Sequence, residues 1–438
     1  MASTTEEIAN IRKKHFIKTV HHYFEVPLQL VRAKGCYVYD EEEREYLDAI
    51  GGIVCISAGH NHPKIKEQLK TMLESDEIQH TSVLYLNRYV AELAVALLEK
   101  APAGLDRVSF TNSGSEANEL AFLAARQATG EGFIVNLRHS YHGGTSGALA
   151  ASGMSTWRFR AQPTSSVTSA VEPYCYRCPF NKKPDSCALE CAKNVESTIE
   201  TSTNGKIAAL IVEPVMGVGG FISPPQEYFT AVANIAHKYG GKYISDEVQT
   251  GMGRSGGEFF LTKELGIDAD MITMAKGLGN GAPIGAVLMK TESSESLGDK
   301  FHFNTFAGDP YQAAQALATI KIIDDEALIA NARKMGAYLK EGLNDLMKRH
   351  ALIGDVRGRG LLLGLELVKD RVSKAFAKEE TVKILEQCRN RGMLIGKGGY
   401  RGNVIRIAPP LSIDRAQCER IIEILDQSFS AIGNSAAS

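Results

Sequence analysis

The stretch "DMITMAKGLGNG", residues 270–281, ends an apolar run with a lysine and follows it with three glycines. Most lysine side chains are solvated, yet Lys276 stands at the end of what reads as a buried strand. Glycines allow other groups to approach the backbone closely. We therefore expect Lys276 to be either a phosphate contact or a reactive amine.

The sequence around this stretch predicts an α/β fold. Between about residues 60 and 320, short apolar runs alternate with amphipathic helical patterns. This alternation predicts βαβ units around a mostly parallel sheet. After about residue 325, "ALIGDVRGRGLLLGLEL" reads as a hairpin of two strands, and further helices and strands follow it. The last part of the chain therefore predicts a separate α+β unit.

The length of 438 residues predicts more than one domain. We assign residues 59–325 to a large domain that holds the site, and residues 326–438 to a small domain. Residues 1–58 contain a short antiparallel pattern and are expected to join the small domain. The segment 155–205, rich in Pro and Cys, is interpreted as an insertion in the large domain.

Composition and charge exclude several classes of partner. The formal net charge is −2 and the pI is near 6.6, which gives no electrostatic basis for binding nucleic acid or an anionic membrane. The first residues contain no apolar segment typical of a secretory signal, and no apolar run approaches the length of a membrane span. We therefore expect a cytoplasmic protein.

Four of the eight cysteines fall within "CYRCPFNKKPDSCALEC". Two closely spaced pairs are compatible with a zinc knuckle. However, the second pair has C-x3-C spacing and no histidine lies among them, so reduced thiols and a loop disulfide remain alternatives. The four cysteines that leave the metal question open are Cys175, Cys178, Cys187 and Cys191.

Polar residues at the predicted strand ends are the candidates for chemistry, because ligands of parallel sheets bind at the carboxyl ends of the strands. Ser113, Gly114 and Ser115 stand where a strand turns into a helix, a place that suits a phosphate or a simple helix cap. Tyr141 and His142 follow the next strand, where an aromatic side chain can cover a flat ring or pack over the strand end.

Two carboxylates, Glu213 and Asp246, stand at matching strand ends, so they either share a cleft or cap helices. Together with Lys276 and a phosphate cradle, they describe what pyridoxal 5′-phosphate (PLP) requires. The lysine forms a Schiff base, for which burial must lower its pKa. The aspartate keeps the pyridine nitrogen protonated, so that the ring can accept electrons.

With these residues in place, the sequence strongly resembles the class III, or ω-amino acid, aminotransferases of PLP fold type I. The resemblance extends from "GGIVCISAGHNHP" to "NVIRIAPPL" and rests on six motifs in order: "TNSGSEANE", "SYHG", "IVEPVMGVGG", "SDEVQTGMGRSG", "MAKGLGNGAPIGAV" and "FNTFAGDP". It implies a large domain with a mostly parallel seven-stranded sheet flanked by helices. It also implies a small α+β domain built from both termini.

The resemblance also implies roles for individual residues. Lys276 would be the Schiff-base lysine and the base for the proton shift, and Asp246 the partner of the pyridine nitrogen. Val248 and Tyr141 would contact the two ring faces, and Gln249 would lie near the ring hydroxyl. Thr305 would reach the phosphate of the neighbouring subunit, which implies a homodimer that could pair into a tetramer. The expected cofactor-binding residues are Ser113, Gly114, Ser115, Tyr141, His142, Glu213, Asp246, Val248, Gln249, Lys276 and Thr305.

For substrates, Arg406 matches an arginine that holds the α-carboxylate of 2-oxo acids and α-amino acids. Glu213 matches a glutamate that neutralises this arginine when the other substrate, an ω-amino donor, has no α-carboxylate. A buried arginine needs a carboxylate from one source or the other. Gly144 stands where relatives acting on 4-aminobutyrate or acetylornithine carry an arginine, which argues against long ω-amino acids. Ile53, and by position Tyr23 and Trp157, are further candidate pocket residues.

The sequence looks closest to the alanine–glyoxylate aminotransferase 2 branch. We therefore predict ping-pong transfer of an amino group from alanine, β-alanine or another ω-amino acid to pyruvate or glyoxylate. Racemases, decarboxylases and phospho-lyases on the same scaffold remain alternatives, because they need the same lysine and aspartate. A non-catalytic protein would be expected to have lost these residues. A nucleotide loop fails because the order G-x4-G-K-[ST] is absent.

Overall fold

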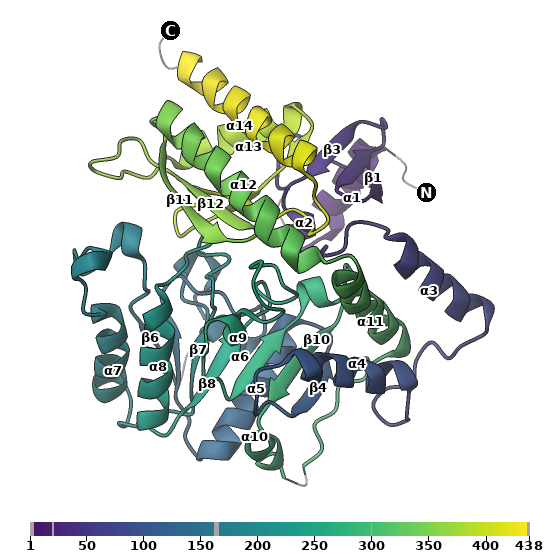
Figure 1. The fold of residues 1–438 in the computed structure, drawn as a ribbon, viewed down its shortest axis with the longest axis vertical. Coiled ribbons are helices and arrows are strands. Elements are labelled where there is room, and N and C mark those ends of the chain that lie inside the picture. The colour runs from purple at the N-terminus through teal and green to yellow at the C-terminus, as the bar shows by residue number, and fades with distance from the viewer. Residues whose placement is uncertain (1–3, 20–21, 162–165, 299, 436–438) are drawn as a thin grey trace.

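The computed structural model describes residues 4–19, 22–161, 166–298 and 300–435. Within these residues the strands form three sheets. The largest lies in the lower half of Figure 1, while the two four-stranded sheets lie above it with the C-terminal helices.

The largest sheet has seven strands in the order β4-β10-β9-β8-β7-β5-β6. Only β10 runs antiparallel to its two neighbours, and the other pairs are parallel. The predicted seven-stranded, mostly parallel sheet is therefore confirmed. In this order the strands span Arg107–Thr111, Gly285–Met289, Met271–Met274, Lys242–Asp246, Ala209–Val212, Ile134–Leu137 and Val167–Ala170.

Helices cover both faces of this sheet, as the alternating buried residues of β7 require. Ala209 and Ile211 join the apolar cluster under helix α5 (Gly114–Thr129), whereas Leu210 and Val212 belong to the larger cluster on the opposite face. The other helices of this part of the chain are α3 (Pro63–Glu74), α4 (Arg88–Lys100), α6 (Ser146–Ala150), α7 (Glu190–Ser202), α8 (Gln226–Lys238), α9 (Leu261–Glu264), α10 (Thr291–Glu295) and α11 (Pro310–Asp325).

The two termini contribute to one sheet, which explains why the purple and yellow-green elements meet in Figure 1. Met393 of the C-terminal part pairs with Leu47, so β13 continues the sheet β1-β2-β3. The predicted hairpin is confirmed as β11 and β12 of an antiparallel sheet, β11-β12-β15-β14.

The bounds of these elements are β1 (Leu30–Lys34), β2 (Tyr37–Asp40), β3 (Glu45–Asp48), β11 (Ile353–Arg359), β12 (Leu362–Leu367), β13 (Met393–Leu394), β14 (Gly396–Gly398), β15 (Val404–Ile407), α1 (Thr5–His15), α2 (Gly51–Val54), α12 (Leu328–Arg349), α13 (Lys378–Asn390) and α14 (Arg415–Ser435). The domain boundaries at residues 58 and 325 stay predictions.

The interpretation of residues 155–205 as an insertion is wrong for two parts of the segment. Strand β6 is the edge strand of the large sheet and pairs in parallel with β5. Helix α7 buries Ala192, Val195 and Ile199 in the main core. The sequence of β6, "VTSA", has only one large apolar residue, so its pattern did not predict a strand.

Three of the four clustered cysteines lie between these two elements and Cys191 lies in the first turn of α7; all four line a pocket of about 560 Å³. All eight cysteines are free, and in the part of the chain that the structure describes no group of three or more His, Cys, Asp and Glu side chains is arranged to hold a metal ion. Burial raises the pKa of Cys191 to about 12, so its thiol keeps its proton. Across the described residues, no helix has the length and apolar character needed to span a membrane.

Candidate active site

A cavity of about 360 Å³ opens at the carboxyl ends of the parallel strands, beside the N-terminus of α5. It brings together ten of the residues predicted from strand ends and motifs. They are Ser113, Gly114, Ser115, Tyr141, His142, Glu213, Asp246, Val248, Gln249 and Lys276. Its volume lies in the range of small-molecule sites, about 300–1,000 Å³.

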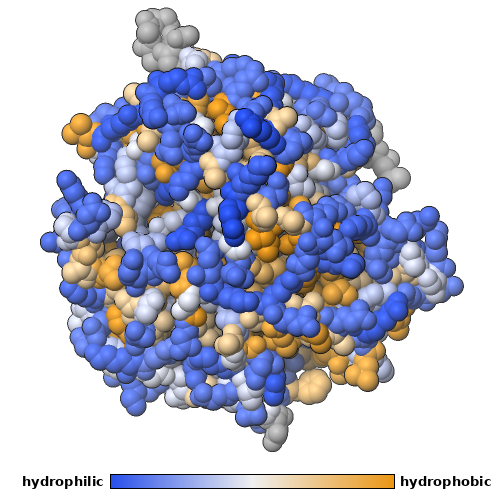
Figure 2. All heavy atoms as spheres, in the orientation of Figure 1, coloured by the Kyte–Doolittle hydropathy of each residue, from blue (hydrophilic) through white to orange (hydrophobic). Residues whose placement is uncertain are grey.

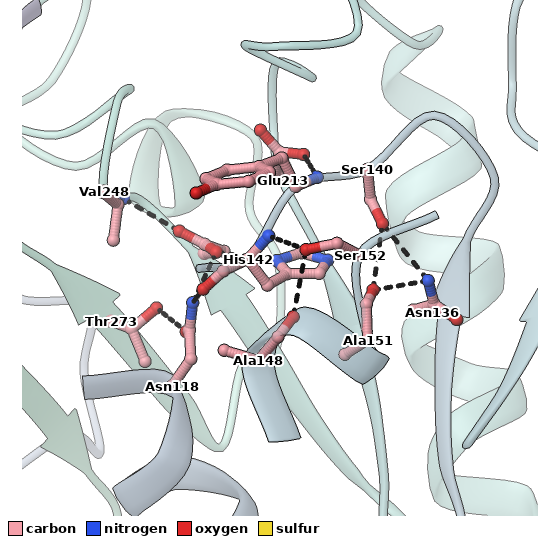
Figure 3. Close-up of polar contacts among 12 residues, drawn as sticks. Asn118, Asn136, Ser140, His142, Ala148, Ala151, Ser152, Glu213, Val248 and Thr273 are labelled. Carbon is pink, nitrogen blue, oxygen red and sulfur yellow. Dashed lines mark hydrogen bonds and ion pairs between the residues drawn. The ribbon is translucent and has the colours of Figure 1, made fainter. Parts of the chain in front are cut away.

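Asp246 ends β8 and is almost fully buried, with 3% of its surface exposed. Its carboxylate accepts hydrogen bonds from Asn118 Nδ2 at 2.9 Å and from the backbone N–H of Val248 at 3.1 Å. The ring Nδ1 of His142 lies 2.7 Å from the same carboxylate. Three partners therefore fix the orientation of Asp246, as Figure 3 shows for the labelled residues around it.

Asn118 was not singled out in the sequence, although it fixes two parts of the site. Its amide also donates to the carbonyl of His142 at 2.7 Å, and its oxygen accepts from Thr273 on β9 at 2.7 Å. Asn118 lies four residues after Gly114 in α5, so both face the cavity. That spacing, together with the position of an amide on an otherwise apolar helix face, could have identified Asn118 from the sequence.

Lys276 follows β9 and has a left-handed backbone, with φ of +45°. Such strained non-glycine residues cluster at functional sites. Within the described residues no hydrogen bond or ion pair holds its ammonium group, although Asp246 and Glu213 are close enough to act on its charge. Burial lowers the pKa of Lys276, which favours a reactive neutral amine.

The glycines after Lys276 have a packing role. A Cβ at Gly277 would lie 2.5 Å from Ser57 Oγ, so only a glycine at position 277 leaves room for the Ser57 side chain. The carboxamide of Asn280 then accepts hydrogen bonds from the N–H groups of Ser57 and Ala58, both at 2.8 Å. These contacts fix the strand end of Lys276 against residues 57 and 58.

The start of α5, where the sequence predicts an anion cradle, lines the cavity. Ser113 is its N-cap and accepts a hydrogen bond from the N–H of Glu116 at 3.2 Å. Ser115 accepts one from the N–H of Gly144 at 3.0 Å. A Cβ at Gly114 would lie 2.8 Å from Val248, so the helix start packs directly against that side chain. Ser113 thus caps the helix and also lines the cavity, which unites the two alternatives considered for it.

Glu213 follows β7 and is 4% exposed. Its two oxygens accept hydrogen bonds from the N–H groups of Tyr141 at 2.9 Å and Gly217 at 2.8 Å. Burial raises the pKa of Glu213 to about 7. Figure 3 shows Glu213 above His142 in the same cavity. Glu213 therefore links two loops that border the site.

Arg406 lies on β15, next to this cavity but outside its lining. Its surface is 6% exposed, and its Nη1 approaches the carbonyl oxygen of Gly217 at 3.4 Å. Among the described residues it forms no ion pair, and Glu213 is bonded to backbone N–H groups instead. The predicted pairing of Glu213 with Arg406 is thus not made in this structure, which leaves the guanidinium available to a carboxylate.

Four other predicted residues also lie outside the lining of the cavity. Thr305 is exposed on the loop before α11, and Ile53 is 59% exposed in α2. Trp157 packs against Tyr141 with ring centres 4.9 Å apart, whereas Tyr23 is half exposed. Cys55, which the sequence did not single out, lines the cavity.

The residues of the cavity fit PLP. A helix start with two serines is suited to binding a phosphate. A buried lysine without a partner is suited to attacking a carbonyl carbon. The side-chain oxygen of Gln249 and Nε2 of His142 are buried without a hydrogen-bond partner in the described structure. A polar aromatic ligand could therefore find a phosphate site, a lysine and a fixed carboxylate at one location.

Comparisons with known proteins agree with this site. Residues 19–429 match the class-III aminotransferase family, and the chain belongs to this family. Members of the family are PLP-dependent enzymes of fold type I, so the fold expected from the resemblance is confirmed.

The chain is similar to an alanine–glyoxylate aminotransferase 2 homolog, mitochondrial, from Arabidopsis thaliana, with 40% identity over 98% of this chain and 88% of that protein. It is 34% identical to a leucine/methionine racemase from Thermococcus litoralis, over 93% and 91% of the two chains. The structure of a PLP-bound amine transaminase from an uncultivated Pseudomonas species superposes with a TM-score of 0.88. That match has 30% identity and covers 95% of this chain and 98% of the other.

Proposed function

We propose that this class-III aminotransferase binds PLP in the cavity and transfers an amino group from an amino acid to a small 2-oxo acid. The observation that carries the proposal is the joint position of Lys276 and Asp246. An ammonium group without a partner and a carboxylate fixed by three partners line the same cavity. Family membership and the PLP-bound structural relative support it.

In this proposal the start of α5, with Ser113 and Ser115, holds the phosphate, and Val248 and Tyr141 border the ring. When bound, the cofactor supplies an electron sink for the bond broken at the substrate Cα. Asp246 stabilises positive charge on the ring nitrogen. Lys276 Nζ takes the proton from the substrate Cα and returns it to a different carbon, and its lowered pKa favours the neutral amine that this task needs.

Arg406 is proposed to bind the substrate carboxylate, because its guanidinium is buried and has donors to spare. Alanine or β-alanine as donor, with pyruvate or glyoxylate as acceptor, agrees with the aminotransferase relative. Gly144 offers no side chain for a distal carboxylate, so long ω-amino acids are expected to be poor donors.

The racemase relative supports a second candidate, amino-acid racemisation on the same residues. Both reactions remove the Cα proton, and they differ in the carbon to which the proton returns. Adding L-alanine without an acceptor separates them: transamination converts the cofactor to its amine form and yields pyruvate, whereas racemisation leaves the cofactor unchanged and yields D-alanine.

The first experiment is an absorption spectrum of the purified protein with PLP, followed by borohydride reduction and peptide mapping. We expect a visible band that L-alanine or β-alanine removes, and a cofactor attached at Lys276 after reduction. If no band forms with added PLP, or if the label maps to another lysine, the proposal is wrong.

We further propose a homodimer in which Thr305 completes the neighbouring site. Thr305 is exposed between Phe303 and Phe306, and the ring of Phe306 lies 5.4 Å from that of His80. Asn304 accepts a hydrogen bond from Asn112 at the rim of the cavity. Figure 2 shows hydrophobic residues gathered at the lower right, around α4. The exposed apolar residues of the two adjoining loops are Val83, Leu84, Tyr85, Leu86, Phe301, Phe303 and Phe306.

Light scattering tests this interface. We expect the mass of two chains or a multiple of it, and we expect Leu86→Glu to shift the protein towards monomer with a loss of bound PLP. A wild-type monomer with full activity would contradict the shared site. The cytoplasmic location expected from the sequence stays a prediction.

A further inference from the structure

Residues 216–222, which we name the glycine loop, lie between the small antiparallel sheet and two residues that line the cavity, Glu213 and Gln249. The ends of the loop are joined by a bridge between Met216 and Ile222. The N–H of Gly217 donates to Glu213, and the backbone of Gly217 packs so closely on the Gln249 amide that a side chain there would overlap it. The loop therefore contacts two proposed site residues.

The glycine loop also holds Arg406. The carbonyl of Gly217 is the acceptor for Arg406 Nη1, and the ring of Phe221 lies 5.5 Å from the guanidinium. Each of these contacts is weak on its own, but both come from the loop. The direction of the guanidinium therefore depends on where the loop lies. A shift of the loop would move the group proposed to bind the substrate carboxylate.

The opposite side of the loop is fixed by the small sheet. The N–H of Gly399 donates to the carbonyl of Val218 at 2.9 Å. Arg357 on β11 donates from Nε to the carbonyl of Gly220 at 2.8 Å. The bond from Arg357 is charge-assisted, and such bonds are roughly twice as strong as neutral ones.

Arg357 is itself held by two carboxylates and an aromatic ring. Its Nη1 lies 2.8 Å from Asp355 Oδ2 and 2.8 Å from Glu366 Oε2, and its guanidinium lies 4.9 Å from the ring of Tyr174. Glu366 is 1% exposed and also pairs with Arg177. Because these charges pair with one another, the cluster fixes Arg357 in one orientation.

We propose that Arg357 is a positioning residue for the substrate carboxylate: by holding Gly220 it fixes the glycine loop, and through the loop it fixes Arg406. This rests on the proposed function, since it requires Arg406 to bind a carboxylate. Arg357 touches neither the cavity nor Arg406, so it acts only through the loop.

Two variants disturb the same carbonyl by different routes. Arg357→Lys keeps the charge for Glu366 but loses the planar donor to Gly220. Gly364→Ala leaves every charge in place, but its Cβ would lie 2.7 Å from the Gly220 oxygen and would push it. The matched control is Arg177→Lys, because Arg177 pairs with the same Glu366 and makes no contact with the loop in the described structure.

Steady-state kinetics with two donors separate positioning from general damage. In both variants we expect KM for L-alanine to rise about tenfold, because small misplacements of a binding group reduce rates strongly. We expect KM for 1-phenylethylamine, which has no carboxylate, to change less than about twofold, since only the contact with Arg406 is affected. Arg177→Lys should leave the ratio of the two KM values as in the wild type.

Hydrogen–deuterium exchange of the cofactor-free and cofactor-bound protein gives a readout independent of activity. We expect faster exchange in peptides covering residues 216–222 in Arg357→Lys and Gly364→Ala, and unchanged exchange there in Arg177→Lys. If Arg357→Lys does not fold, Gly364→Ala decides the question.

An equal rise of KM for both donors, or loop exchange as slow as in the wild type, would overturn the proposal. Failure of the proposed function looks different: the wild type itself would then show no PLP band and no reaction with L-alanine, whatever the exchange of the loop.

Discussion

Arg254 and Arg406 are both buried arginines, but their surroundings differ. Arg254 is 1% exposed and donates to the carbonyls of Pro409 at 2.7 Å and Ile56 at 3.1 Å. Arg406 is 6% exposed, and its one hydrogen bond within the described structure, to Gly217, is 3.4 Å long. Burial lowers the pKa of both groups, that of Arg254 to about 10.

The difference separates a structural cation from a binding cation. Arg254 uses its donors to join residue 56, residue 409 and its own loop, so it holds three distant segments together. Arg406 keeps donors free, and its Nε is buried without a partner in the described structure. A buried charge without a partner is costly, so its presence indicates that a ligand supplies the partner during function.

Lys276 has even fewer partners than Arg406, because no hydrogen bond or ion pair within the described residues holds its ammonium group. We expect Lys276→Ala to reduce transamination by about 10⁴-fold, the upper range for a general acid–base group. Product formation from L-alanine and a 2-oxo acid measures this. Lys263→Ala, at a half-exposed lysine that pairs with Glu258, is the control and should keep full activity. Activity retained within tenfold in Lys276→Ala would contradict the assigned role.

Arg406→Gln tests the binding cation directly. A lost hydrogen bond to a charged group corresponds to roughly 10–100-fold in affinity, so we expect KM for L-alanine and pyruvate to rise by that factor. Thermal stability should not fall, because no strong native bond is lost. A large loss of stability with unchanged KM would show that Arg406, like Arg254, is a structural cation.

Arg254→Met should give the reverse result. Two charge-assisted hydrogen bonds are lost and two buried carbonyls stay unpaired, so we expect a loss of about 3 kcal/mol in stability. The midpoint of thermal unfolding measures it. KM for pyruvate should stay within about twofold of the wild type once PLP is saturating, because Arg254 binds no substrate in our proposal. A selective rise of KM for carboxylate substrates in Arg254→Met would contradict the assignment of Arg254 as a purely structural cation.

The sequence predicted most of the cavity because parallel strands present their carboxyl ends at one edge. Asp246 ends its strand, and Glu213 and Lys276 come just after theirs, so strand direction alone brings the three together. The sequence could not show that Glu213 would bond to Gly217 and leave Arg406 unpaired. That choice depends on the glycine loop, whose path is set by Arg357 on a strand far along the chain.

Other failures have the same origin in tertiary contacts. Strand β6 is stabilised by pairing with β5, and its own side chains carry little strand pattern. The cysteine spacing left a metal, reduced thiols and a disulfide as alternatives, because spacing does not fix where four thiols point; no metal-binding arrangement is found among the described residues. Residue types at strand ends could be predicted, whereas partners across the chain could not.

The smallest expected effect concerns Glu213, the acidic group that acts electrostatically on Arg406. Burial raises the pKa of Glu213 to about 7, above the value of about 4.3 for a free glutamate. The native state therefore binds the proton more tightly than the unfolded state, and the resulting stability is present at pH 4 and lost as pH rises towards 7. Above pH 7 the ionised Glu213 then competes with a substrate carboxylate for Arg406.

We accordingly expect KM for pyruvate, which has no amino group to titrate, to rise severalfold between pH 6 and pH 8.5. The increase should vanish in Arg406→Gln, since no guanidinium remains for the two carboxylates to share. It should persist in Arg254→Met, whose cation faces no substrate. A pH dependence equal in all three proteins would mean that Glu213 does not act through Arg406, and the contrast between the two arginines would then rest on hydrogen bonding alone.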